Sequence, residues 1–245
     1  MRIAIISDIH SNIYALESTF KKIDDLNRAH QIDKIICLGD ILNYGCNPNQ
    51  VIESLMSYNT NYDMEFLIGN HDQLHFDLKN GSSEYFNKLP DYLKESIEWT
   101  IKELNYDLEA TFNWKTYTSL NKLFFSHANP FDFPDWSYLS GDEIIHKAAI
   151  KLSSIGCIAG IFGHIHRSYE LRNIYKEVSI FNVGSVGQPR GLGSTFGVID
   201  SFINSELKFE LININYQTKR HTSEILESSL SPQTAEKLLD FFKDD

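Results

Sequence analysis

The chain has 245 residues, of which 42% are hydrophobic, and this is enough to bury the core of one large domain over residues 1–245. Its formal net charge of −11 repels nucleic-acid backbones and anionic lipid headgroups. Because no cluster of Lys and Arg offsets that charge, we expect neither extended nucleic-acid binding nor a role at a membrane surface.

The cysteines and the N-terminus indicate the compartment. Cys37, Cys46 and Cys157 are odd in number and widely spaced, which fits a reducing cytoplasm better than a disulfide framework. We interpret them as small buried apolar side chains. The apolar run before Asp8 is too short for a signal peptide, and no stretch approaches the roughly 20 apolar residues of a membrane span. We therefore expect a cytoplasmic protein.

The first seventy residues alternate between short aliphatic runs and amphipathic segments. Residues 3–6, 34–38 and 64–68 are predicted strands buried on both faces of a sheet. Residues 12–29 show helical spacing of their apolar side chains, and a second helix is predicted to begin near Asn47 and Pro48. Strands separated by helices predict an α/β fold with a parallel or mixed sheet.

The next segment, residues 75–121, is rich in aromatic side chains and mostly helical, with one helix expected at about residues 90–105. Such an aromatic segment is commonly a helical layer that packs on a sheet. The alternative is a lid that shapes the substrate site, and the pattern leaves both interpretations open.

Strand patterns return in the second half. Residues 123–125, 158–162 and 179–181 are predicted strands, with a helix at 141–154, a strand pair at 196–199 and 207–214, and a final helix from Ser231 to residue 242. A Gly-rich loop at 182–191 offers backbone N–H groups and Arg190 to an anion. A plain tight turn is the alternative interpretation of this loop, and Asn12 is equally compatible with a helix cap or with lining the site.

Several predicted strands end in polar side chains that can bind metal ions. Because residues two apart in an extended backbone share a side, Asp8 and His10 can reach one ion. There are too many good ligands for one tetrahedral zinc site and about enough for two ions that share a carboxylate. The mixture of nitrogen and oxygen favours Mn, Fe or Zn over Mg or Ca. The seven candidate ligands are Asp8, His10, Asp40, Asn70, His127, His164 and His166.

The order of these residues carries a resemblance to a known family. The series Asp8-x-His10, Gly39-Asp40, residues 69–72, His127 and Gly163-His164-x-His166 resembles the five signature blocks of the calcineurin-like metallophosphoesterases. Residues 7–17 and 182–190 are similar to a bacterial branch of small phosphoesterases within that superfamily. The resemblance implies a four-layer α/β/β/α sandwich of two mixed sheets.

The resemblance also implies roles for the site residues. One ion would be held by Asp8, His10 and His166, a second by Asn70, His127 and His164, and Asp40 would bridge them. His71 would act as the proton donor, oriented by Asp72. A hydroxide bridging two cations would attack phosphorus, Arg190 and the loop amides would stabilise the equatorial oxygens, and His71 would protonate the leaving group.

Two departures from the family pattern restrict the function. Asn43 and Tyr44 stand where many members have Asp and the protein-phosphatase branch has Arg, so we do not expect a protein phosphatase, and Arg190 is predicted to bind phosphate instead. We expect a hydrolase acting on a small phosphorylated substrate, either a phosphomonoester or a phosphodiester and nucleotides included. The alternative is a non-catalytic metal-binding scaffold or regulatory protein on the same fold. The pattern leaves the oligomeric state open.

Overall fold

The computed structural model describes residues 1–191, 193–203 and 206–242. Its first sheet is built around the N-terminal strand and has the order β11-β10-β1-β2-β3-β4. The strands β1 to β4 run parallel, whereas β10 is antiparallel to both of its neighbours. These strands are β1 (Arg2–Ile6), β2 (Lys34–Cys37), β3 (Met64–Leu67), β4 (Trp114–Lys115), β10 (Ser194–Ile203) and β11 (Glu206–Ile214).

The second sheet is also mixed and has the order β5-β6-β7-β9-β8. Its three central strands run parallel, and the edge strands β5 and β8 are antiparallel to their neighbours. These strands are β5 (Tyr117–Leu120), β6 (Leu123–Ser126), β7 (Ala159–Phe162), β8 (Ser168–Tyr175) and β9 (Val178–Val183).

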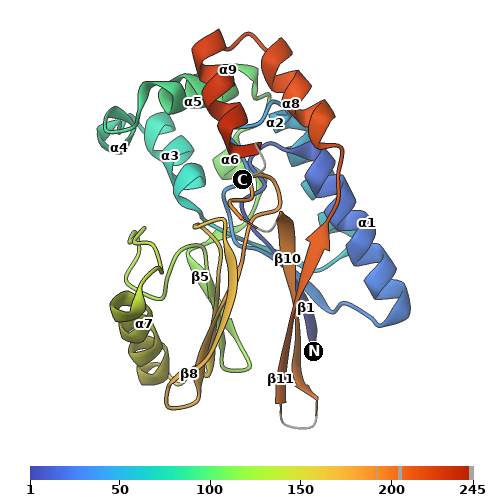
Figure 1. Cartoon of the computed structure of the whole chain (residues 1–245), viewed down its shortest axis with the longest axis vertical. Helices are drawn as coiled ribbons and strands as arrows, with labels where there is room; N and C mark the ends of the chain where they lie inside the picture. The colour runs from blue at the N-terminus through green and yellow to red at the C-terminus, as the bar shows by residue number, and fades with distance from the viewer. Residues whose placement is uncertain (192, 204–205, 243–245) are drawn as a thin grey trace.

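The two sheets pack face to face, as the alternation of side chains along β1 shows. Ile3 and Ile5 point into the core shared with β6, β7 and β9, whereas Ala4 and Ile6 point outward. Helices α1 (Ile13–Ala29) and α2 (Pro48–Asn61) cover the outer face of the first sheet, and α7 (Asp142–Ser154) covers that of the second (Figure 1). The predicted four-layer α/β/β/α sandwich is therefore confirmed.

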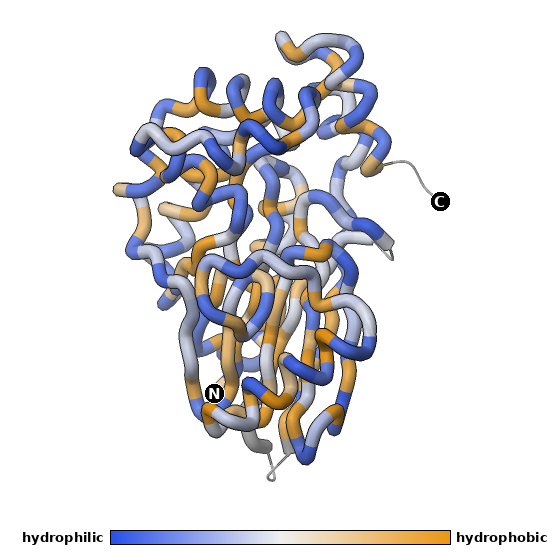
Figure 2. The backbone as a smooth tube through the Cα atoms, turned by 90° about the vertical axis from the view of Figure 1, so that its left-hand side faces the viewer, coloured by the Kyte–Doolittle hydropathy of each residue, from blue (hydrophilic) through white to orange (hydrophobic). Residues whose placement is uncertain are grey.

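The remaining helices lie above the ends of the strands (Figure 1). Leu93 and Ile97 of α5 share an apolar cluster with Ile225 and Leu238 of the C-terminal helices. Figure 2 shows apolar stretches concentrated in the strands, with polar residues on the outer turns of the helices. These helices are α3 (Asn70–Lys79), α4 (Glu84–Asn87), α5 (Asp91–Glu103), α6 (Leu108–Thr111), α8 (Thr218–Glu227) and α9 (Pro232–Leu239), followed by a 3₁₀ turn at Asp240–Phe242.

The segment at 75–121 divides between two packing partners. Phe76, Leu108 and Phe112 join the core on the outer face of the first sheet, whereas α5 packs on α9. The segment also ends in β4 and β5, which its aromatic composition did not reveal. The edge strand β8 escaped prediction because none of its side chains is fully buried and its apolar residues do not alternate. Helix α8 escaped it because only His221 and Ile225 are buried. No helix within the described residues has the length and apolar character to cross a membrane.

Candidate metal centre

The structure brings six of the seven predicted ligands into two adjoining groups at the ends of the strands. One group contains Asp8, His10, Asp40 and His166, and the other contains Asp40, His127 and His164. Within each group the potential ligand atoms all lie within 4.8 Å of one another, and every side chain is buried. Asp40 belongs to both groups, which is the geometry that two ions sharing a carboxylate require.

The imidazoles face one another and the carboxylates through the ring nitrogens that do not bond to the backbone. Nε2 of His10 lies 3.1 Å from Nε2 of His166, and Nε2 of His127 lies 3.1 Å from Nδ1 of His164. His166 Nε2 also lies 3.1 Å from Asp8 Oδ1. Nitrogen and oxygen lone pairs that converge in this way, inside a buried site, are suited to surround a cation.

The opposite ring nitrogen of each of these histidines donates to a backbone carbonyl. Such a bond fixes both the tautomer and the orientation of a metal-binding imidazole. The nitrogen left to face an ion is therefore Nε2 in three of the rings and Nδ1 in His164. The four pairs are His10 Nδ1 to Leu42 O (3.0 Å), His127 Nδ1 to Leu38 O (3.1 Å), His166 Nδ1 to Gln188 O (2.6 Å) and His164 Nε2 to Trp136 O (3.0 Å).

Asn70, the seventh predicted ligand, starts α3 directly above β3. Its side chain is buried, and its Oδ1 has no hydrogen-bond partner among the described residues. The Asn70 side chain also contacts the hydroxyl of Tyr85. A buried amide oxygen without a donor is costly unless something else satisfies it, and a divalent ion would do so. The donor set therefore fits the implied metals.

The ligands at the strand ends adopt left-handed backbone conformations. Asp8, His10, Asp40, His164 and His166 all have φ between 48° and 68°. Asp8 and His10 do come together, but the predicted reason, an extended backbone, is wrong. A left-handed turn brings the two side chains together. Such φ values cost of order 1 kcal/mol or more per residue and concentrate at functional sites. Backbone hydrogen bonds from Asp8 N to Gly39 O (3.0 Å) and from His10 N to Asp40 O (3.1 Å) hold them.

The charges of the centre depend on one another. Burial opposes ionisation of Asp40, but the imidazoles of His127 and His71 outweigh it and hold its pKa well below the ordinary value. Burial likewise disfavours charge on His127, yet Asp40 raises the pKa of His127 to about 9. Burial lowers the pKa of His164 to about 4. The centre thus keeps its carboxylates ionised, and a cation that binds there would displace a proton from His127.

Asp72 was expected to orient the ring of His71, but it does not contact that ring. Its Oδ2 accepts from the backbone N–H groups of Asp40 (2.7 Å) and Gly69 (2.9 Å), and its Oδ1 accepts from that of Ile41 (3.1 Å). Both oxygens are thus directed at the backbone of the strand ends. Burial and the neighbouring Asp40 raise the pKa of Asp72 to about 7. Asp72 therefore positions the backbone of Asp40, and the predicted orientation of His71 by Asp72 is corrected.

The ring of His71 is held by Asn43, which the sequence indicated only as a departure from the family pattern. Asn43 Nδ2 lies 2.9 Å from His71 Nδ1, and Asn43 Oδ1 lies 2.8 Å from Nε2 of the buried His75. Since the amide nitrogen can only donate, Nδ1 of His71 is the acceptor and Nε2 carries the proton. Sequence reasoning missed His75, although its four-residue spacing from His71 on one helix predicts a shared face.

The Gly-rich loop supports Asp8 and His166. Four of its N–H groups already donate to oxygen atoms of the protein, so they cannot bind phosphate. Gly187 packs so closely that a Cβ there would lie 1.8 Å from Ile9 O. Asn12 proves to be the cap of α1, accepting from Ala15 N, and it also donates to Gly187 O. The four N–H groups are those of Val186 (to Ser7 O), Gly187 (to Asp8 O), Gln188 (to Ser185 Oγ) and Arg190 (to His166 O).

Arg190 lies at the edge of the centre. Its guanidinium stacks on the ring of Phe241, 5.2 Å from the centroid, and donates to Gln188 Oε1 at 3.3 Å. Its buried Nε has no hydrogen-bond partner in the described part of the chain. The position fits the predicted contact with a phosphate, because part of the guanidinium remains available.

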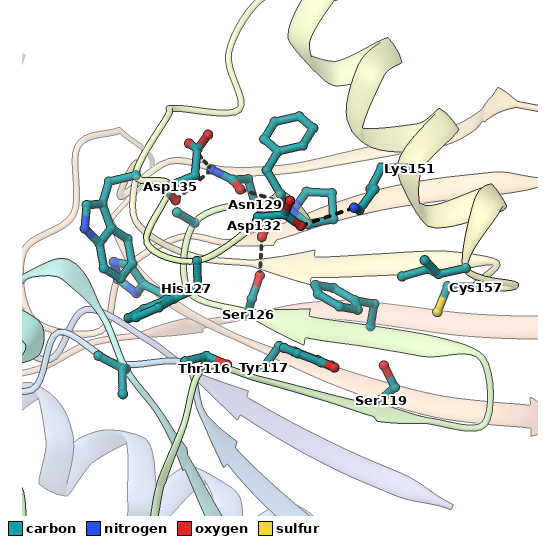
Figure 3. Close-up of a pocket in the computed structure, with 18 of the residues that line it drawn as sticks. Thr116, Tyr117, Ser119, Ser126, His127, Asn129, Asp132, Asp135, Lys151 and Cys157 are labelled. Atoms are coloured by element: carbon teal, nitrogen blue, oxygen red, sulfur yellow. Dashed lines mark hydrogen bonds and ion pairs between the residues drawn. The ribbon is translucent and has the colours of Figure 1, made fainter.

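A cavity of about 610 Å³ borders the His127 side of the centre (Figure 3). His127 lies at one end and Cys157 at the other, and the centroid of the Trp136 ring is 6.0 Å from that of His127. The loop over it is tied by Asn129, whose amide donates to Asp135 Oδ1 (3.1 Å) and Ser137 O (3.0 Å). The same loop also contacts the centre, since Trp136 O accepts from His164.

Comparisons with known proteins agree with this geometry. The chain is 33% identical, over 96% of its length and 96% of the relative's, to uncharacterized protein MJ0912 of Methanocaldococcus jannaschii. Its structure is similar to that of hypothetical protein PH1004 from Pyrococcus horikoshii (TM-score 0.81, 22% identity, 97% of each chain). It is also similar to a metallophosphoesterase from Sphaerobacter thermophilus (TM-score 0.71, 23% identity, 98% of this chain and 99% of that one). The model of the calcineurin-like phosphoesterase superfamily domain matches residues 1–201, and the chain belongs to that superfamily.

Proposed function

We propose that the protein hydrolyses phosphoesters at a centre of two divalent ions, with His71 as the proton donor. The observation that carries this proposal is the pair of buried ligand groups that share Asp40, with the ring of His71 5.2 Å from that of His10. The first ion would be held by Asp8, His10, Asp40 and His166, and the second by Asp40, Asn70, His127 and His164.

The ions would supply positive charge to the phosphoryl oxygens and would lower the pKa of water. The mixed nitrogen and oxygen ligands favour Mn, Fe or Zn. The residues of the chain position the reactants. Arg190 would contact the negatively charged phosphoryl oxygens, and the cytoplasm would supply a small phosphorylated substrate such as a nucleotide.

His71 is suited to protonate the leaving group. Because Asn43 donates to its Nδ1, the proton sits on Nε2. Burial, with His166 and His127 adding to it and Asp40 opposing it, lowers the pKa of His71. In its protonated form the ring can pass the Nε2 proton to a leaving oxygen as the ester bond breaks, and it then returns to the neutral imidazole.

The test is turnover of bis-(4-nitrophenyl) phosphate and 4-nitrophenyl phosphate by protein stripped of metal and reloaded with Mn. We expect His71→Asn to lower kcat by about 100-fold or more while two ions stay bound. The exposed His146 provides the control, because His146→Asn should change neither rate. The ratio of the two rates separates diesterase from monoesterase.

Two outcomes would contradict the proposal. Undiminished turnover in His71→Asn would remove the assigned donor. Absence of turnover on both esters in protein that holds two ions would favour the alternative, a non-catalytic scaffold on the same fold.

A further inference from the structure

A hollow of about 890 Å³ opens beside the metal centre, and both Arg167 and Arg190 line it. Tyr216, Phe241 and Phe242 form part of its wall. Two guanidinium groups that line one hollow form an unusual local concentration of positive charge in a chain with a net charge of −11. Such a concentration, on a surface that otherwise repels anions, attracts an anionic ligand.

These two arginines differ from the other four in the chain. Each of the others has a carboxylate within 4.0 Å: Arg2 pairs with Asp200, Arg28 with Asp25, Arg172 with Glu170 and Arg220 with Glu224. Neither Arg167 nor Arg190 forms such a pair with any described residue. Asp240 also lines the hollow, and its carboxylate pairs with Lys237 at 3.6 Å.

The backbones of both arginines adjoin His166, a predicted metal ligand. Arg167 follows it in the chain, and the backbone N–H of Arg190 donates to His166 O at 3.0 Å. Gln188 O, two residues before Arg190, accepts from the His166 ring at 2.6 Å. A ligand bound in the hollow would therefore lie at a defined place next to the first ligand group.

We infer that Arg167, in this hollow, binds a second phosphate group of the substrate, distinct from the reacting phosphate that Arg190 is proposed to contact. Guanidinium groups form paired, charge-assisted hydrogen bonds with phosphate oxygens, and unpaired arginines lose no existing ion pair when they do so. The substrate class is then a small molecule with two separate phosphate groups, of which a nucleoside 3′,5′-bisphosphate is the simplest. The inference rests on the proposed function, since it specifies the substrate of that centre.

The test compares adenosine 3′,5′-bisphosphate with adenosine 5′-phosphate, which differ by one phosphate group. The variant is Arg167→Ala, because Arg167 is exposed and has no ion pair to lose on substitution. We expect KM for the bisphosphate to rise by about 10-fold to 100-fold, because the variant loses a charge-assisted hydrogen bond to the second phosphate. The KM for the monophosphate and for 4-nitrophenyl phosphate should change less than about 2-fold. The matched control is Lys22→Ala, which removes one positive charge from the exposed face of α1.

Calorimetric binding of the same two nucleotides provides a measurement that does not need turnover. Tighter binding of the bisphosphate by the wild type, lost in Arg167→Ala at an unchanged Tm, supports the inference. Equal binding of the two nucleotides, or an equal loss of both in the variant, overturns it and leaves the proposed hydrolysis intact. Selective bisphosphate binding without turnover of any ester would overturn the proposed function alone.

Discussion

The side-chain amide of Asn43 donates to Nδ1 of His71 across a distance of 2.9 Å. The same amide accepts from His75, so that two imidazoles and one neutral amide form a buried chain beside the metal ligands. A neutral donor holds the His71 ring in one tautomer without adding negative charge next to it. The chain thus orients its predicted proton donor through Asn43 and not through the carboxylate of Asp72, as the resemblance had implied.

Substitution of Asn43 should therefore separate orientation from charge. We expect Asn43→Ala to lower kcat by about 10-fold to 100-fold at unchanged metal content, because the His71 ring is no longer held. Asn43→Asp should keep the orientation but raise the pKa of His71, which moves the pH–rate profile to higher pH. Profiles of kcat between pH 5 and pH 9 measure both effects, and identical profiles for Asn43→Asp and the wild type would contradict the contact.

Asp72→Asn should destabilise the protein and weaken metal binding. The carboxylate accepts from three backbone N–H groups. An amide in its place would direct its own NH₂ group at one of these backbone N–H groups, and two donors cannot form a hydrogen bond. We expect a loss of about 2–3 kcal/mol in unfolding free energy and a loss in metal affinity of about 10-fold or more. Urea unfolding and metal titration measure these effects. Asp77→Asn, on the same helix, is the control that should change neither.

The buried ring of His221 predicts a loss of stability in acid. Burial lowers the pKa of His221 to about 4, although Glu224 acts in the opposite direction, and the ordinary value of the unfolded chain is about 6.5. Since the folded state binds this proton less readily, the stabilisation is complete above pH 6.5 and is lost as pH falls toward 4. Between pH 7 and pH 5 this one group should account for about 2 kcal/mol of unfolding free energy.

His221→Leu should remove that share of the pH dependence, as urea unfolding at pH 7 and pH 5 would show. The exposed His146 again offers the control, because His146→Leu should leave the pH dependence unchanged. An equal loss of stability in the wild type and in His221→Leu would show that other groups are responsible.

Two glycines of one loop should differ in their sensitivity to the same substitution. A Cβ at Gly187 would lie 1.8 Å from Ile9 O, which is backbone and cannot move aside, whereas a Cβ at Gly191 meets nothing within 4 Å. We expect Gly187→Ala to lower the unfolding free energy by about 3 kcal/mol and Gly191→Ala to leave it nearly unchanged. Thermal unfolding of the two variants measures the difference. Equal Tm values would show that the backbone of the loop shifts to accommodate the added Cβ.

The sequence predicted those parts of the molecule that a local pattern encodes. The run from Ile3 to Ile6 is aliphatic because both of its faces are buried, and the polar residues after it mark the end of the strand. The same pattern at Asp40, His127 and His164 placed the candidate ligands at one edge of the sheets. Runs of this kind need no knowledge of the partner strand.

The parts that escaped prediction depend on partners that are distant in sequence. Asn43 and His71 are 28 residues apart, and nothing within either segment indicates their contact. The N–H groups of the Gly-rich loop looked available for an anion because their acceptors, Ser7 O and Asp8 O, lie at the other end of the chain. The edge strand β8 has no buried face regular enough to show alternation.

The orienting groups of the four metal-facing imidazoles are all backbone carbonyls, belonging to Leu38, Leu42, Trp136 and Gln188. A side-chain substitution at any of these positions leaves the acceptor in place. The hydrogen bonds that orient the histidines are therefore insensitive to the identity of the side chain at these four positions. A systematic substitution scan of the protein would consequently identify the histidines and overlook the backbone carbonyl oxygens that orient them.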